Sequence, residues 1–181
     1  MKILLDMDGV IAEFLPRLIE MYNHLTNEGI KITDIRSNNS YKWFGDQWLA
    51  KKIKDSTGFI RSLKPAEGAI EAVEDLHRRG HEIVFVSNGT NCPSSGHEKR
   101  EWLKYYFHKT WKFAPLVLTY HKHHVRGDCL VDDTPRNLDN LHPTTQGLLW
   151  HQPYNAEVTG YERIYDWSHL LDWITKNDQI V

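Results

Sequence analysis

Short apolar segments alternate with helical patterns over most of this chain. Five segments have the length and the branched or aromatic side chains of buried strands. They are residues 2–5, 83–86, 116–118, 129–131 and 147–150. Apolar residues recur at helical spacing over residues 14–25, 69–76, 97–108 and 167–174. Strands that alternate with helices predict an α/β fold, a Rossmann-like three-layer structure with a parallel sheet covered on both faces.

One stretch interrupts this alternation. Residues 30–64 are first polar and then aromatic, and we predict a small insertion with short helices. Its aromatic side chains either pack in a core or form a wall that stacks on a planar ligand such as a base. They are Tyr41, Trp43, Phe44 and Trp48.

Composition narrows the class of protein without selecting a function. The chain has 181 residues, 25% of them charged and 40% hydrophobic, as in a soluble globular protein of one domain. The formal net charge of -2 does not favour a nucleic-acid polymer as partner, although a single nucleotide needs only one or two local cations. No apolar run is long enough to span a membrane, and two cysteines predict no disulfide framework. We therefore expect a cytoplasmic protein without a membrane partner.

Polar residues directly follow three of the predicted strands. In parallel sheets, ligands bind beyond the carboxyl ends of the strands, so we expect these residues to converge at one edge. They are Asp6 and Asp8, Ser87 and Asn88, and Asp132 and Asp133.

Asp6 and Asp8 have the groups that phosphoryl transfer requires. Two carboxylates this close favour a cation between them, and Mg²⁺ prefers such oxygen ligands. One carboxylate can attack phosphorus, while the other protonates the leaving oxygen and then deprotonates water. A loop with two solvated acids would explain this pair alone, and a turn or helix cap would explain Asp132 and Asp133. The two acid pairs together favour a functional site.

Phosphate oxygens need hydrogen-bond donors and a fixed positive charge. Ser87 and Asn88 offer a hydroxyl and an amide, although an ordinary turn explains them equally well. Lys99 or Lys122 could supply the charge, and the alternative for each is a solvated surface lysine.

Three histidines, His121, His123 and His124, flank Lys122. A metal site built from them is the weaker interpretation, because no cysteine or spaced histidine partner stands out.

These residues resemble the motifs of the haloacid dehalogenase superfamily. The Asp-Met-Asp-Gly-Val run that starts at Asp6 is similar to its first motif, and Ser87 to its second. Lys122 resembles the third motif, and Asp132-Asp133 the fourth. All four occur in the order that the superfamily has, which implies a phosphatase on its α/β core.

Over residues 2–155 the chain is also similar to the 5'(3')-deoxyribonucleotidases, which dephosphorylate deoxynucleoside monophosphates. The likeness includes the Pro-Ala-Glu-Gly-Ala run that starts at Pro65, and the residues Glu98, Lys99 and Trp102. It implies a catalytic core of residues 1–15 and 65–181, with residues 16–64 as a small helical cap over the substrate.

The resemblance also implies roles in catalysis. Asp6 would be the nucleophile and Asp8 the general acid and base. Mg²⁺ would be held by Asp6, the backbone carbonyl of Asp8, and Asp133.

For the substrate, the resemblance implies a small phosphomonoester, in particular a deoxynucleotide. Ser87 and Lys122 would hold the phosphate, and Phe14 would line the nucleoside side. Trp43 and Phe44 would stack on the base. Aromatic side chains on the cap could also serve a homodimer.

The second motif departs from the pattern of animal members, which have Thr-Ser-Pro where this chain has Ser87-Asn88-Gly89. The hydroxyl is kept, but nucleotide selectivity is left open. Two alternatives therefore stand beside the nucleotidase. One is a phosphatase for a sugar phosphate or another small phosphomonoester, and the other is a noncatalytic binding protein on the same scaffold.

Overall fold

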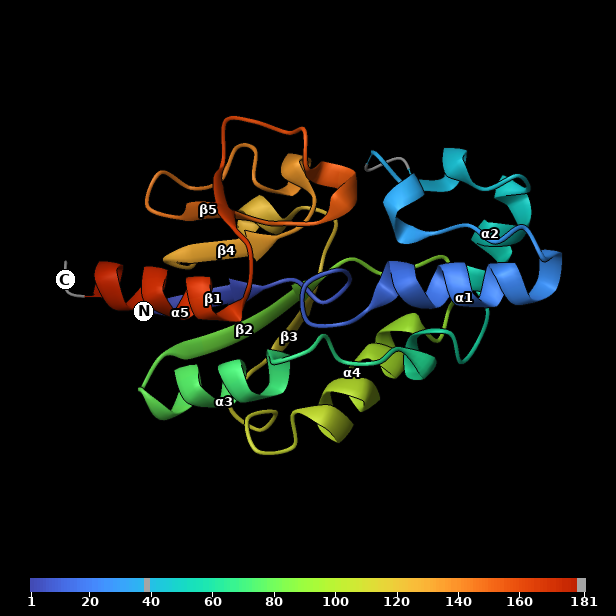
Figure 1. Cartoon of the computed structure of the whole chain (residues 1–181). Helices are drawn as coiled ribbons and strands as arrows, with labels where there is room; N and C mark the ends of the chain where they lie inside the picture. The colour runs from blue at the N-terminus through green and yellow to red at the C-terminus, as the bar shows by residue number, and fades with distance from the viewer. Residues whose placement is uncertain (38–39, 179–181) are drawn as a thin grey trace.

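Six strands form one sheet in the order β3-β2-β1-β4-β5-β6, and every neighbouring pair is parallel (Figure 1). The structure is a computed structural model that describes residues 1–37 and 40–178. The predicted α/β class with a parallel sheet is confirmed. The strands are β1 (Lys2–Leu5), β2 (Glu82–Ser87), β3 (Leu116–Leu118), β4 (Cys129–Asp132), β5 (Gln146–Trp150) and β6 (Glu162–Ile164).

Five α-helices accompany the sheet, together with single turns of 3₁₀-helix. None of the helices in the described ranges is long and apolar enough to cross a membrane. The α-helices are α1 (Phe14–Thr26), α2 (Gln47–Lys54), α3 (Ala69–Arg78), α4 (Ser95–Tyr106) and α5 (Trp167–Asn177). The 3₁₀ turns are η1 (Ile32–Asp34), η2 (Ser40–Trp43), η3 (Ile60–Ser62), η4 (Lys122–His124), η5 (Pro135–Asn137) and η6 (Pro153–Asn155).

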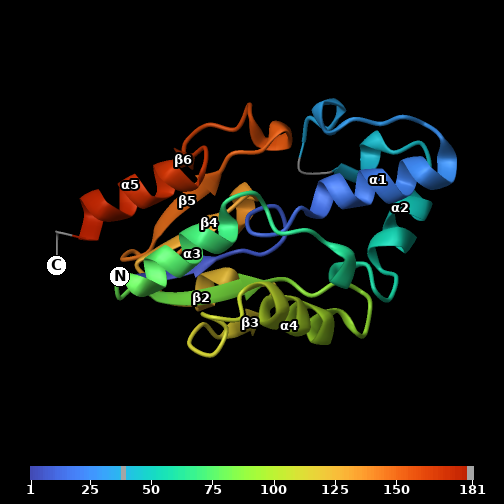
Figure 2. The ribbon, with the colours of Figure 1, turned by 60° about the horizontal axis from the view of Figure 1, so that its bottom comes forward.

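The two faces of the sheet are covered differently. Alternate strand residues such as Leu5 and Phe85 pack with α3, α4 and α5 in one core cluster, and Figure 2 shows these helices in front of the sheet. Leu4 and Leu130 point to the opposite face, which is covered by turns and loops instead of α-helices. The connection from β4 to β5 spans only residues 133–145 and contains two prolines, which prevents a long helix there.

The segment predicted to form a cap, residues 16–64, lies beyond the carboxyl end of β1 and contains most of α1 and all of α2 (Figure 1). We use the name cap for this segment below. Tyr22 and Phe44 pack against each other in its interior, where their rings meet edge to face with centroids 4.8 Å apart. The hydroxyl of Tyr22 donates to Glu28 and accepts from the N–H of Asp46, each at 2.7 Å. The start of α2 is therefore fixed to α1 through one buried side chain.

Candidate active site

The carboxyl ends of three neighbouring strands meet at one edge of the sheet. β1 lies between β2 and β4, and the N–H of Asp6 extends the ladder by donating to the carbonyl of Val131 at 3.0 Å. Ser87 ends β2, and Asp132 ends β4. The structure therefore brings the three polar pairs of the sequence to the same place.

Lys122 holds the carboxylate of Asp6. Its Nζ lies 2.8 Å from Oδ1 of Asp6 and 2.5 Å from Oδ2 of Asp132. Burial alone would lower the pKa of Lys122, but the charges of the two carboxylates raise it above its ordinary value. Oδ1 of Asp6 also accepts from the N–H of Met7 at 2.7 Å, so Oδ2 is the oxygen left for another partner.

Asp132 is a support for this arrangement. Its Oδ1 accepts from the N–H of Thr134 at 2.9 Å and from Nδ2 of Asn137 at 3.0 Å, and its Oδ2 is used by Lys122. Burial, followed by the charge of Asp6, raises the pKa of Asp132 to about 6. Both of its oxygens are committed to neighbours within the protein.

Lys99 holds the second carboxylate. Its fully buried ammonium group donates to Oδ2 of Asp8 at 2.6 Å and to the hydroxyl of Ser87 at 2.8 Å. Burial raises the pKa of Asp8, against the nearby charge of Lys99 and with the help of that of Asp6. Oδ1 of Asp8 is buried and has no hydrogen-bond partner among the described residues, so its capacity to accept a hydrogen bond is unused.

Asp133 is held by the segment that follows β5. The hydroxyl of Tyr154 donates to its Oδ2, and Nδ2 of Asn155 donates to its backbone carbonyl at 2.8 Å. Its Oδ1 accepts from the hydroxyl of Thr134 at 3.2 Å. Burial, together with the charges of Asp132 and Asp6, raises the pKa of Asp133 well above its ordinary value.

The site has the composition of a magnesium site. Asp6, Asp132 and Asp133 each offer a carboxylate oxygen, and these atoms lie within 4.8 Å of one another. Four carboxylates, counting Asp8, face the two buried lysines, so negative charge is in excess when all are ionised. Hard oxygen ligands of this kind suit Mg²⁺. Asp132 accepts two hydrogen bonds on each oxygen and does not line the cleft, whereas Asp133 accepts one on each. Asp6 and Asp133 therefore fit a direct role as ligands best.

A cleft of about 310 Å³ opens above these carboxylates. Asp6, Asp8 and Asp133 lie on its wall, with Asn88 beside them. Oδ1 of Asn88 is buried without a hydrogen-bond partner in the described ranges. Aromatic and basic side chains make up half of the remaining lining, namely Phe14, Tyr41, Tyr120, Tyr154, Lys54 and Arg136.

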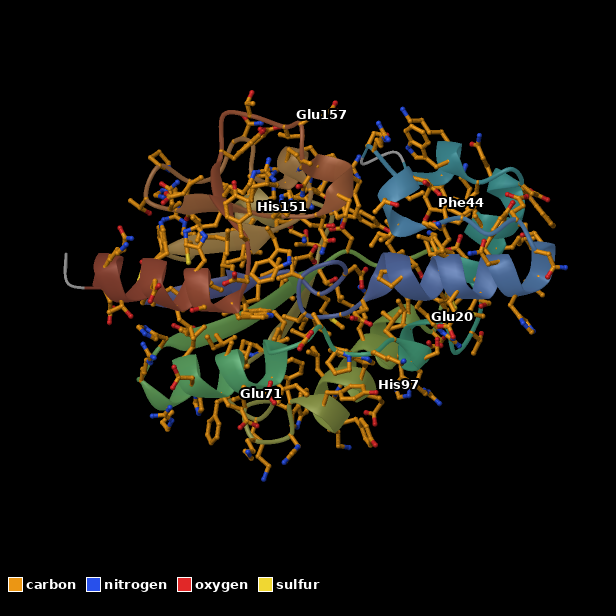
Figure 3. All side chains as sticks on the ribbon, viewed as in Figure 1. Glu20, Phe44, Glu71, His97, His151 and Glu157 are labelled. Atoms are coloured by element: carbon orange, nitrogen blue, oxygen red, sulfur yellow. The ribbon has the colours of Figure 1, made fainter. Side chains whose placement is uncertain are left out.

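The two cap residues expected to stack on a base do not line this cleft. Phe44 is only 2% exposed and is used in the interior of the cap, where Figure 3 places it. Trp43 is partly buried and donates from Nε1 to the hydroxyl of Ser37 at 3.3 Å. The aromatic cap residue that lines the cleft is Tyr41, which the sequence singled out only as one of a group.

Phe14 and Asn88 line the cleft, but the three residues predicted as candidates for holding the phosphate do not. Ser87, Lys99 and Lys122 are at most 2% exposed, behind the carboxylates. Lys122 adjoins Asp6 and Lys99 adjoins Asp8, so each lysine belongs to a different aspartate.

Comparisons with known proteins agree with this geometry. The family described as "5' nucleotidase, deoxy (Pyrimidine), cytosolic type C protein" matches residues 1–180. A protein of Bordetella bronchiseptica named "Putative 5'(3')-deoxyribonucleotidase" is 32% identical over 177 residues, which cover 93% of this chain and 92% of that protein. The 5'(3')-deoxyribonucleotidase of Bacillus subtilis is 27% identical over 171 residues, covering 93% of this chain and 95% of that enzyme.

Solved structures share the fold at low sequence identity. A haloacid dehalogenase superfamily hydrolase from Ehrlichia chaffeensis superposes with a TM-score of 0.53 at 11% identity, covering 97% of this chain and 96% of that chain. The D,D-heptose 1,7-bisphosphate phosphatase of B. bronchiseptica, solved with magnesium and phosphate, gives 0.56 at 11% identity, covering 97% and 99%.

The parallel sheet, with aspartate pairs at its carboxyl edge, has the fold of these haloacid dehalogenase superfamily structures. The family match and the curated relatives place the chain among the phosphatases that act on nucleotides. Within that class, the family model matches residues 1–180, and the Bordetella and Bacillus relatives that match 93% of the chain are named as 5'(3')-deoxyribonucleotidases. The chain belongs to the 5'(3')-deoxyribonucleotidase family.

Proposed function

We propose that this phosphatase hydrolyses deoxynucleoside monophosphates with Mg²⁺, through a phosphorylated Asp6. The observation that carries the proposal is the pair of aspartates on the wall of the cleft, each held by its own buried lysine. Lys122 fixes Asp6 with Oδ2 free, and Lys99 fixes Asp8 with Oδ1 free of protein partners. Two carboxylates with different supports can take two different roles.

In the first step, a carboxylate oxygen of Asp6 forms a bond to phosphorus while the bond from phosphorus to the nucleoside oxygen breaks. Asp8 donates a proton to that leaving oxygen. In the second step, Asp8 takes a proton from water as the water oxygen bonds to phosphorus. The bond between Asp6 and phosphorus then breaks and inorganic phosphate is released.

Asp6 and Asp133 would hold Mg²⁺, which supplies positive charge opposite the phosphate oxygens when it is bound. Ser87 and Lys122 would move or reorient slightly to reach those oxygens from behind the carboxylates. The aromatic side chains of Phe14 and Tyr41 line the cleft and would contact the nucleoside. We place this activity in the cytoplasm, where the unpaired thiols of Cys92 and Cys129 stay reduced.

The test is release of phosphate from a panel of deoxynucleotides, ribonucleotides and sugar phosphates, with Mg²⁺ and with a chelator. Mg²⁺-dependent hydrolysis of deoxynucleotides is expected, and it should be absent in Asp6→Asn. Mass spectrometry of the acid-quenched enzyme should find a phosphoryl group on the peptide that contains Asp6. A preference for sugar phosphates would overturn the substrate, and hydrolysis that survives in Asp6→Asn would overturn the mechanism.

A further inference from the structure

Three histidine side chains gather on one short turn at the surface. His121 precedes η4, and His123 and His124 end it. The ring centres lie 5.6 Å apart for His121 and His123, 5.9 Å for His121 and His124, and 4.2 Å for His123 and His124. We propose that these rings bind one divalent transition-metal ion, such as Ni²⁺, Cu²⁺ or Zn²⁺, at a site separate from the aspartates.

The spacing of the rings fits a shared ion. A metal bound about 2.0–2.1 Å from one nitrogen of each ring would hold the ring centres roughly 4.5–5.5 Å apart. The separations in the structure lie close to that range but outside it: 4.2 Å is shorter, and 5.6 and 5.9 Å are longer, so the rings must shift to share an ion. Imidazole is a favoured ligand for Ni²⁺, Cu²⁺ and Zn²⁺, whereas Mg²⁺ prefers the oxygen ligands at the active site.

Binding requires the histidine rings to turn toward one another. Within the described residues, the three aspartates are the one group of three side chains whose ligand atoms already lie within 4.8 Å of one another. The histidine rings must therefore turn to point their nitrogens at a common centre. His121 and His124 are exposed and His123 is partly exposed, so the rings have room to do so.

The backbone of the turn is already fixed. The N–H of His124 donates to the carbonyl of His121 at 3.0 Å, and the N–H of Val125 donates to the carbonyl of Lys122 at 2.9 Å. The N–H of His121 also donates to the hydroxyl of Thr119 at 3.0 Å. Because these bonds hold the three Cα positions together, binding would cost less ordering of the chain than on a flexible loop.

The same turn supplies Lys122 to the active site. While the histidines point outward, Lys122 is 2% exposed and its ammonium group holds Asp6 and Asp132. An ion that draws the three rings together would pull on the backbone on both sides of this lysine. We therefore expect occupancy to lower the phosphatase rate, a consequence that rests on the proposed function, whereas binding itself does not.

The experiment is calorimetric titration of the full chain, without an affinity tag, with Ni²⁺ in excess Mg²⁺. Wild type should bind one Ni²⁺ per chain, and His121→Gln, His123→Gln and His124→Gln should each weaken binding at least about tenfold, the loss seen even for outer-shell partners of metal sites. The matched control is His97→Gln, an exposed histidine on α4 (Figure 3), which should bind Ni²⁺ as wild type does. Equal melting temperatures would establish that the variants are folded.

Electron paramagnetic resonance of bound Cu²⁺ adds a readout that does not depend on activity. Nitrogen couplings from at least two imidazoles are expected in wild type. They should be lost in the triple variant, in which His121, His123 and His124 are all replaced by Gln. Ni²⁺ binding that is equal in wild type and the triple variant would overturn the site. Inhibition by Ni²⁺ that is equal in both would overturn the link to Lys122, even where calorimetry supports the site.

Discussion

Position 9 requires glycine, both for its backbone conformation and for the closeness of its neighbours. Its φ of +85° lies in the region that residues with a side chain rarely adopt. A Cβ atom at this position would collide with Oδ2 of Asp133 and lie 2.7 Å from the hydroxyl of Tyr154. The residue therefore lets the loop that carries Asp6 and Asp8 approach Asp133 closely.

For Gly9→Ala we expect a loss of stability of about 1–3 kcal/mol from backbone strain, together with loss of most phosphatase activity because the Cβ displaces Asp133. Urea unfolding and phosphate release would measure the two effects. Gly29→Ala is a matched control, since Gly29 has a φ of +72° but no atom within 4 Å of an added Cβ. It should lose about 1 kcal/mol of stability and keep full activity. An active Gly9→Ala enzyme would show that the close approach is not needed.

Tyr154 is a positioning residue for Asp133. The hydroxyl of Tyr154 donates to the carboxylate of Asp133. The two residues are 21 positions apart in the sequence, so folding is needed to bring them together. Tyr154→Phe should raise the Mg²⁺ concentration for half-maximal activity by about 10–100-fold, with the rate largely restored at high Mg²⁺. Calorimetric titration with Mg²⁺ should show the same weakening. Tyr161→Phe, which removes a hydroxyl bonded to Asp139 outside the site, should change neither value.

At the scale of elements, α4 fixes the segment that leads from the cap back to the core. The carboxylate of Glu98 accepts from the N–H of Gly58 at 2.8 Å and from the N–H of Arg61 at 3.3 Å. Nε1 of Trp102, one turn further along, donates to the carbonyl of Leu63 at 2.9 Å. Both side chains are buried, so α4 is the anchor between the cap and the core.

Glu98→Gln should lower the free energy of unfolding by about 1.5–3 kcal/mol at neutral pH, since it removes a charged acceptor from these bonds. Burial would raise the pKa of Glu98, but the hydrogen bonds from Ser94, Gly58 and Arg61 lower it below its ordinary value. Folding thus favours the ionised form. This stabilisation is complete above the ordinary pKa of glutamate and is lost as pH falls through the lower pKa of the folded state.

Urea unfolding over a series of acidic buffers measures this effect. The gap in stability between wild type and Glu98→Gln should shrink as the pH falls, while Glu101→Gln, a partly exposed position on the same helix, should cost little at any pH. If the difference in unfolding free energy stays constant with pH, the packing of the Glu98 side chain, and not its charge, stabilises the segment that leads back from the cap.

The elements that sequence predicted are those with strong local patterns. The five apolar runs became five strands. Four of them lie inside the sheet, whereas β3 lies at its edge and leaves Leu118 exposed. β6 was missed, since its Glu-Arg-Ile segment has no apolar run and is held by pairing with β5.

At the scale of the whole molecule, the cleft combines parts that are distant in the sequence. The aspartate pairs could be predicted because each follows a strand and their meeting follows from parallel pairing. The aromatic wall could not, because Tyr41 and Phe44 belong to one local cluster and only tertiary packing directs one to the cleft and the other inward. The same limit applies to Tyr154, which reaches Asp133 from another connection.

The cap should therefore set substrate preference through Tyr41. Its ring lines the cleft, with Nζ of Lys51 5.7 Å from its centre. If it stacks on the base, Tyr41→Ala should raise KM for a deoxynucleotide roughly 5- to 150-fold, as expected for about 1–3 kcal/mol of stacking. Hydrolysis of glycerol phosphate, which has no ring, should be unchanged. Trp48→Ala, on the exposed surface of the cap at 66% exposure, is the matched control and should leave both substrates unaffected. An equal loss with both substrates in Tyr41→Ala would instead assign Tyr41 to closure of the cap over any phosphomonoester.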